Sequence, residues 1–78
     1  MVKEELLKHL GAHIRKLREE RKLSQNDLAF SIGKDQQSIQ RLEAGRINPS
    51  FYYLYQIAEG LSLNINELTS FVSKLKDK

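Results

Sequence analysis

Residues 23–46 read LSQNDLAFSIGKDQQSIQRLEAGR, and this stretch decides the fold. Its pattern predicts two short helices joined by a tight turn, in which Gly33 supplies the positive φ that such a turn needs. The small residue Ala29 lies where the two helices must approach. The second helix keeps an outward face of Gln36, Gln37, Gln40 and Arg41. Glutamine and arginine can make paired hydrogen bonds to base edges in the major groove of DNA, so this face predicts a surface that reads sequence.

Capping residues set the boundaries of the pair. Ser24 followed by Asp27 predicts the start of the first helix through a shortened capping box, and Asp35 predicts the start of the second. Gly33 and Gly45 are placed to end them. A helix-turn-helix unit is therefore expected at about residues 25–44.

Further helices are expected on both sides of this unit. Residues 3–21 carry apolar residues at helical spacing, and Gly11 inside them either frays the helix or packs closely on a neighbour. Ser50 predicts the start of a helix over 51–59, with Phe51 among its inward residues, and Asn66 predicts the start of the last helix. No segment alternates with period two, so the predicted fold class is all-α with five helices.

Composition limits the classes of protein that fit. Seventy-eight residues suit one small domain spanning 1–78, and the absence of cysteine excludes disulfides and thiolate metal sites. No apolar run approaches the roughly 20 residues of a membrane span, and the start has no signal-peptide pattern, so a cytoplasmic protein is expected. Residues 1–46 hold ten Lys and Arg against seven Asp and Glu. The predicted helix pair therefore lies in the basic part of the chain, as binding to nucleic acid requires.

The spacing of Gln25, Ala29, Gly33 and Gln36, together with the segment QQSIQRLEAG, resembles the Cro and phage-repressor type of helix-turn-helix protein, the XRE family. The segment is particularly similar to the recognition helix of lambdoid phage repressors. The resemblance covers roughly residues 10–71. It implies a five-helix lambda-repressor-like bundle of a prokaryote or phage, associated with the nucleoid, which binds operator DNA as a two-fold dimer with its third helix in the major groove.

The resemblance also implies roles for individual residues. Gln25 would contact a backbone phosphate and steady the first of two base-reading glutamines, Gln36 and Gln37. Arg41 departs from the phage pattern, which has a third glutamine there, and an arginine favours guanine. Arg18 and Glu43 have the positions of an internal ion pair that would orient the recognition helix. The predicted DNA-binding set is completed by Lys34, Ser38, Gln40, Arg46 and Asn48.

The end of the chain predicts an assembly surface. Leu68, Phe71, Val72 and Leu75 have the spacing of one apolar helix face within residues 66–78. A small core can bury only some of them, and apolar surface left over suggests a homodimer interface. The alternative is that Phe71 and Val72 close the core of the monomer itself.

Other candidate groups have plainer explanations. Tyr52, Tyr53 and Tyr55 either pack with a polar tip in solvent, or offer a phenol to phosphate or a patch to a partner. His9 and His13 lie one turn apart, but no carboxylate or thiol cluster supports a metal site. No nucleophile and base are arranged for catalysis, so neither an enzyme, a cofactor nor a metal is expected.

The function expected is therefore a transcriptional regulator, acting as a repressor on an inverted-repeat operator in double-stranded DNA. One alternative is the antitoxin of a toxin–antitoxin pair, with a toxin as its protein partner. Another is a protein-interaction module that has lost DNA binding. The outward glutamines and Arg41 argue against that last alternative, because a pure interaction face would show more apolar residues.

Overall fold

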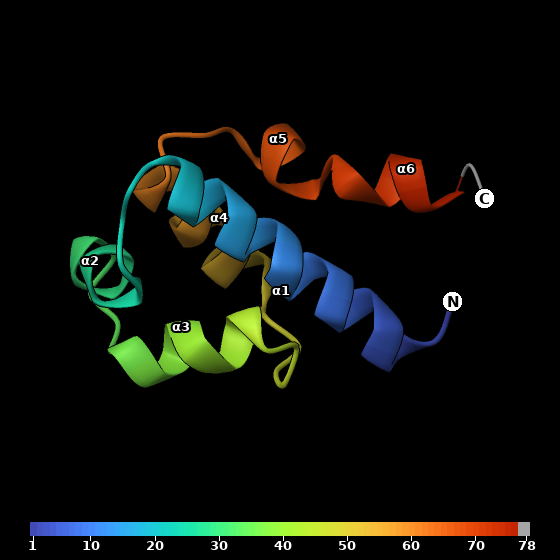
Figure 1. Ribbon diagram of the computed structural model, residues 1–78, viewed down its shortest axis with the longest axis horizontal. Coiled ribbons are helices and arrows are strands. Elements are labelled where there is room, and N and C mark those ends of the chain that lie inside the picture. Colours follow the sequence, from blue (N-terminus) through green and yellow to red (C-terminus); the bar gives the residue numbers. More distant parts are fainter. Residues whose placement is uncertain (77–78) are drawn as a thin grey trace.

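The computed structural model describes residues 1–76, and the regular structure in that range is entirely helical, which confirms the all-α class. The helices in chain order are α1 (Lys3–Glu20), α2 (Gln25–Ser31), α3 (Gln36–Glu43), α4 (Phe51–Gly60), α5 (Ile65–Thr69) and α6 (Phe71–Lys76). Helices α1 and α4 pass through the middle of the molecule (Figure 1). Helix α3 runs along one edge, α5 and α6 run along the opposite edge, and α2 closes one end.

One hydrophobic core holds these helices together. Each of the helices α1 to α5 contributes to it, and Ile14, Leu28 and Ile39 are completely buried. Each fully buried aliphatic side chain stabilises the fold by roughly 1.5–3 kcal/mol relative to its exposure. The other buried apolar residues are Leu10, Ala29, Leu42, Ile57, Ala58, Leu61 and Leu68.

Helix α1 packs directly on the end of α3. A Cβ atom added at Gly11 would lie 2.6 Å from the carbonyl oxygen of Leu42 and would also collide with that of Glu43. Of the two possibilities raised for Gly11, close packing is therefore the one observed. Gly45, with φ of +74°, approaches Lys8 of α1 in the same way. The C-terminal end of α3 is thus held close against α1.

The predicted caps of the helix-turn-helix are present. The Ser24 hydroxyl accepts a hydrogen bond from the Asp27 amide at 2.9 Å, and the Asp27 carboxylate accepts one from the Ser24 amide, also at 2.9 Å. Asp35 accepts the Ser38 amide at 2.8 Å. Gly33 has a φ of +71° in the turn. These local contacts fix where α2 and α3 begin.

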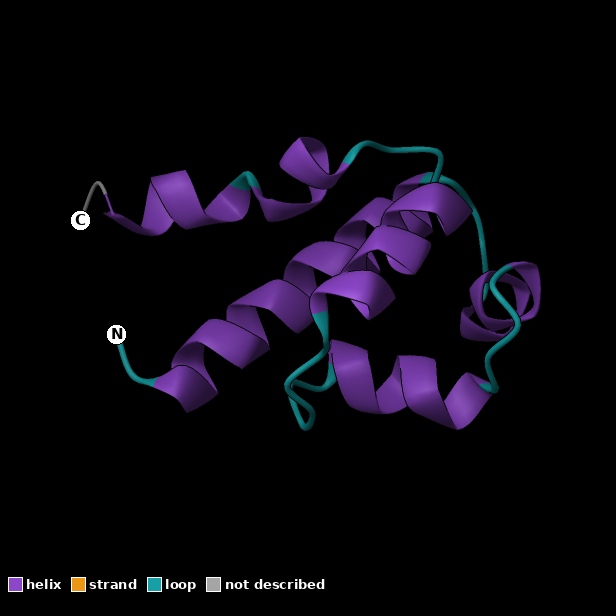
Figure 2. Ribbon diagram, turned by 180° about the vertical axis from the view of Figure 1, so that it is seen from behind, coloured by secondary structure: helices purple, strands orange, loops and turns teal. Residues whose placement is uncertain are grey.

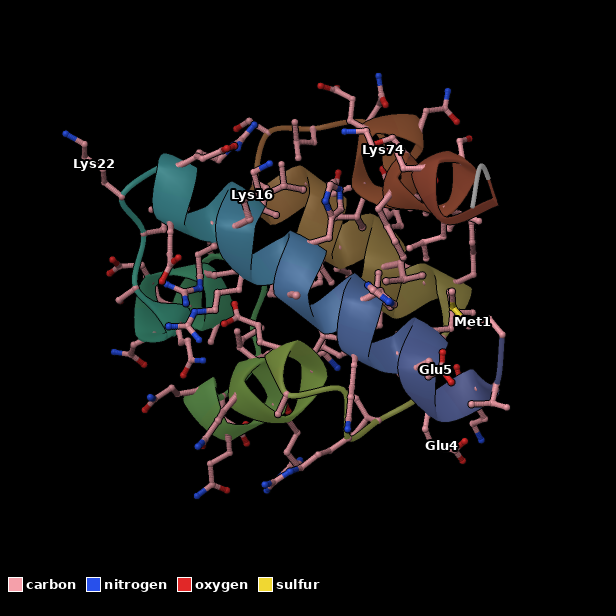
Figure 3. The ribbon with its side chains drawn as sticks, turned by 45° about the vertical axis from the view of Figure 1, so that its right-hand side comes forward. Met1, Glu4, Glu5, Lys16, Lys22 and Lys74 are labelled. Atoms are coloured by element: carbon pink, nitrogen blue, oxygen red, sulfur yellow. The ribbon has the colours of Figure 1, made fainter. Side chains whose placement is uncertain are left out.

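The turn after α1 has a backbone conformation that the sequence pattern does not predict. Lys22 adopts a φ of +57° without being glycine. The amide of Leu23 bonds back to the carbonyl of Arg18 at 3.2 Å, which closes the helix end in the way a glycine usually allows. The Lys22 side chain points away from the molecule (Figure 3).

Two expectations about the later helices are wrong. The last helical segment begins after Asn64, not Asn66, because Asn64 and Glu67 form a reciprocal capping box. This segment is also divided at Ser70 into α5 and α6. Phe51, the first residue of α4, was expected to face the core but is 72% exposed.

Candidate nucleic-acid interface

Helix α3 has one buried face and one open face. Ile39 and Leu42 are buried in the core. The opposite side chains, Gln37, Gln40 and Arg41, are exposed. Helix α3 itself runs along one edge of the molecule (Figure 1). Together with Ala44 and Arg46, the three exposed side chains line an open hollow. The structure therefore presents hydrogen-bonding and cationic groups along one face of α3 that no other helix within residues 1–76 covers.

A buried ion pair anchors this helix from behind. The Arg18 guanidinium donates to both carboxylate oxygens of Glu43, from Nε at 2.7 Å and from Nη2 at 3.0 Å. Its third nitrogen, Nη1, donates to the Leu23 carbonyl at 2.6 Å. The hydrogen bonds to Glu43 raise the pKa of Arg18, although burial opposes this, so the arginine stays charged. The expected ion pair is thus present, and it links α1 to α3 and to the loop before α2.

Hydrogen bonds continue from this pair to the open surface. Gln25 Nε2 donates to Glu43 Oε1 at 3.1 Å, and Gln36 Nε2 donates to Gln25 Oε1 at 3.4 Å. The contact between Gln25 and Gln36 is the one that the family resemblance implied. The bond between Gln25 and Glu43 was not foreseen, because the two residues lie 18 positions apart and no local pattern joins them. The side chain of Gln36 is therefore connected to a carboxylate in the core.

The remaining predicted DNA-binding residues lie in three places. Lys34 is exposed in the turn before α3, and Ser38 is half-buried on the first turn of α3. Arg46 lines the hollow beside Arg41. Asn48 lies elsewhere, in the wall of an apolar hollow with Pro49 and Leu54, so the structure does not bring it together with the others.

The carboxylate of Asp35 sits at the N-terminus of the recognition helix. Its hydrogen bond from the Ser38 amide lowers its pKa, with smaller contributions from the charges of Arg41 and Lys34. Asp27 has a lowered pKa for the same reason at the start of α2, where it accepts from Ser24. Both caps are therefore ionised at neutral pH, and each places a negative charge where the helix dipole favours it.

The predicted assembly surface needs one correction. Leu68 is completely buried within the monomer, because α5 is pressed against α1 and α4. Phe71 is half-buried and its ring packs against His13, with 5.2 Å between ring centroids. Val72 and Leu75 remain only partly covered and line an apolar hollow with Met1 and Leu6.

His13 and Tyr55, which lie outside the helix-turn-helix, make contacts within the fold. His13 Nε2 lies 3.3 Å from the Glu67 carbonyl oxygen, so His13 joins α1 to α5. The Tyr55 hydroxyl donates to Glu59 at 3.0 Å, and this bond raises the pKa of Tyr55.

In residues 1–76, none of the helices has the length and apolar character needed to cross a membrane.

Comparison with known proteins defines the class. Residues 14–68 match the helix-turn-helix family model, and this range contains α2, α3 and α4 entirely. The chain therefore belongs to the helix-turn-helix family of Cro/C1 (XRE) type, a family of DNA-binding transcriptional regulators.

Individual relatives agree with this assignment. An uncharacterised HTH-type transcriptional regulator of Sinorhizobium fredii, y4dJ, is 33% identical over 66 residues, covering 85% of this chain and 86% of the relative. The restriction-modification controller protein C.AhdI from Aeromonas hydrophila superposes with a TM-score of 0.77 at 34% identity, covering 80% of this chain and 94% of the controller. A hypothetical transcription factor from Neisseria, NHTF, has a TM-score of 0.78 at 23% identity, covering 96% and 90% of the two chains, and shows the shared fold.

Proposed function

We propose that this protein is a sequence-specific transcriptional regulator that represses by binding an inverted-repeat operator as a homodimer. The observation that carries the proposal is the uncovered face of α3, which presents Gln37, Gln40 and Arg41 beside Arg46. Protein side chains read the major groove through such donors and acceptors. The protein acts by occupying DNA and needs no catalytic step, cofactor or metal, and we expect it to work at the nucleoid in the cytoplasm.

Within this proposal the residues divide into base readers and phosphate contacts. Gln36 and Gln37 read bases from the exposed first turn of α3, and Arg41 reads a guanine nearer the operator centre. Gln25 holds Gln36 in place and contacts a phosphate at the start of α2. Contacts that position the helix, mostly to phosphates, come from Lys34, Ser38, Gln40 and Arg46, whereas Asn48 lies apart from this surface and is left out of the set.

The homodimer is supported by the other end of the molecule. Met1, Leu6, Val72 and Leu75 surround an apolar hollow between the first turns of α1 and the last turn of α6. The first turn of α1 and helix α6 lie at the same end of the bundle (Figure 2). A two-fold dimer through the same patch on both copies would cover it and would set two recognition helices about one DNA turn, ~34 Å, apart.

Selection of bound duplexes from a random library tests the function directly. The selected sites should be inverted repeats whose half-site centres lie ~10 base pairs apart. Binding measured at two salt concentrations should fall steeply as salt rises. A selection that enriches no motif would contradict sequence-specific regulation, and a single enriched half-site would contradict the homodimer.

The likeness to C.AhdI favours one biological setting as a second candidate. At 34% identity over 94% of that controller, this chain also suits control of restriction-modification genes. The selected operator should then occur upstream of a restriction or methyltransferase gene in the source genome. Its occurrence before a toxin gene would support the antitoxin role instead.

A further inference from the structure

Tyr53 differs from the two tyrosines beside it. It lies on the first turn of α4, and its hydroxyl is buried with no hydrogen-bond partner among residues 1–76. Tyr52 is 67% exposed to solvent, and the Tyr55 hydroxyl is bonded to Glu59. Buried polar groups in proteins are nearly always paired, because an unpaired one destabilises the fold. The Tyr53 hydroxyl therefore requires an explanation that its neighbours do not.

The surroundings of this hydroxyl belong to the predicted DNA-binding surface. The ammonium group of Lys34 lies 5.1 Å from the centroid of the Tyr53 ring. Burial raises the pKa of Tyr53, the charge of Asp35 raises it further, and the charge of Arg41 lowers it. The phenol thus lies near the charges of Asp35 and Arg41, its ring lies under the Lys34 ammonium, and it remains a neutral donor at physiological pH.

The Tyr53 hydroxyl can donate a hydrogen bond, and Lys34 and Arg41 add positive charge near it. Such a site suits an oxygen atom of a singly charged anion. Asp35 opposes an anion here, but its carboxylate is already bonded to the Ser38 amide, and both cations lie close enough to lower its pKa. The phosphodiester backbone borders the groove that α3 would occupy, so phosphates are the anions that this edge of α3 would meet.

We propose that Tyr53 and Lys34 together bind one phosphate of the DNA backbone. Lys34 is an exposed residue of the turn, and its flexible side chain can rotate off the aromatic ring. Once the side chains that cover the hydroxyl also move aside, the ammonium and the phenol contact the same phosphate, and the hydroxyl gains the partner that it lacks in the free protein. This inference rests on the proposed DNA binding and adds a phosphate contact that comes from α4.

Tyr53→Phe tests the inference because it removes the hydroxyl and keeps the ring under Lys34. The free protein should melt at the same temperature or higher, since a buried unpaired group is removed. Affinity for a duplex carrying the selected operator should fall about tenfold, and affinity for a random duplex should fall by a similar factor. The salt dependence should not change, because no charge is lost.

Two further variants sharpen the test. Tyr52→Phe is the matched control, and it should leave both melting and DNA affinity unchanged. Lys34→Met should lower the affinity and reduce the salt slope by about one. Tyr53→Phe combined with Lys34→Met should lose less affinity than the two single losses multiplied, because both groups serve one phosphate.

Wild-type affinity in Tyr53→Phe, or a lower melting temperature, would overturn the phosphate site, since the hydroxyl would then have no role on DNA or would already be paired. Those results leave the proposed function intact when the wild-type protein binds its operator. A wild-type protein that binds neither duplex would overturn the proposed function and this site together.

Discussion

The two ends of this bundle are closed in different ways. At the end that carries the recognition helix, Arg18, Glu43 and Gln25 connect α1, α2 and α3 through hydrogen bonds within one chain. At the other end α6 is attached through Phe71, while Val72 and Leu75 border an open apolar hollow. The orientation of the recognition helix is thus set inside the monomer, whereas the opposite end has apolar surface that a second copy could cover.

Removing the carboxylate of Glu43 at the hydrogen-bonded end should have the largest effect, a loss of folding stability. Glu43→Ala leaves the buried charge of Arg18 without its partner, and we expect a loss of about 3–5 kcal/mol in the free energy of unfolding. Urea unfolding followed by circular dichroism measures it. The control is Glu19→Ala, which breaks the exposed pair with Arg15 and should cost less than about 0.5 kcal/mol. A loss below 1 kcal/mol in Glu43→Ala would show that this pair does not anchor α3.

Placing a charge in the apolar hollow should break the other end without unfolding the chain. Val72→Glu should weaken dimerisation about 100-fold, equivalent to about 2.7 kcal/mol, because a carboxylate would have to be buried between the two copies. Sedimentation equilibrium measures the dimer, and circular dichroism checks the fold. Ser73→Glu, at an exposed position one residue further along α6, should leave the dimer intact. Equal behaviour of the two variants would argue against an interface at this hollow.

Removing the base-reading amides should affect binding and not folding. Gln36→Ala and Gln37→Ala should each cost about 1–3 kcal/mol at the selected operator, with little loss on random duplex. Gln25→Ala should weaken operator binding through the same contact as Gln36→Ala, so the double variant should lose less than the sum. Additive losses would mean that Gln25 acts only on phosphate. Operator affinities equal to wild type in both single variants would contradict the assignment of α3.

Arg41→Gln should change the affinity for the operator less, but it should clearly change which base is preferred. The selected motif should lose its guanine at one inner position of each half-site, because glutamine pairs best with adenine. Selection from a random library compares the two motifs. Arg46→Gln should instead weaken binding to all sequences alike. An unchanged motif in Arg41→Gln would show that this arginine reads no base.

As the pH falls, α2 and α3 should lose stability before the helices at the other end of the bundle. The pKa values of Asp27 and Asp35 are lowered from an ordinary value of 3.8 in the folded protein. The folded state therefore binds fewer protons than the unfolded state, so these caps stabilise the fold above pH ~4, and this contribution is lost as the pH falls through the folded values. Ser50, which caps α4, has no titratable group.

Hydrogen exchange of the backbone amides, measured between pH 5 and 3, tests the loss of the Asp27 and Asp35 caps in each helix separately. Exchange, corrected for its intrinsic pH dependence, should accelerate in α2 and α3 first. Asp35→Asn keeps an acceptor at the cap and should remove the pH dependence of α3. Uniform acceleration in every helix would show that other carboxylates dominate the acid response.

The starts of α2 and α3 and the turn between them could be predicted because they depend on residues close together in the sequence. Ser24 and Asp35 bond to amides three residues away, and Gly33 needs only its own backbone freedom, so each can be identified without knowing the tertiary structure. The same kind of signal was present at Asn64, which has Glu67 three residues later, and the choice of Asn66 overlooked it.

Contacts between distant residues could not be predicted in this way. The apolar stripe that contains Leu68 gives the inward face of a helix, but only the packing of α5 shows that Leu68 is fully covered. The exposure of Phe51 likewise depends on how the helices pack. The bond between Gln25 and Glu43, and the place of Lys34 over Tyr53, join residues 18 or 19 positions apart, so only the folded chain brings them together.

The tie between Gln36 and Gln25 also bears on how such a protein acquires a new operator. Gln37, Gln40 and Arg41 project from α3 without a hydrogen bond to any other side chain among residues 1–76, so each can be exchanged without disturbing a partner. Gln36 can change only if Gln25 tolerates the loss of its neighbour. Divergence of binding preference should therefore proceed freely at the first three positions, while positions 25 and 36 should change as a pair. An engineer seeking a new specificity would randomise the former and treat the latter as a unit.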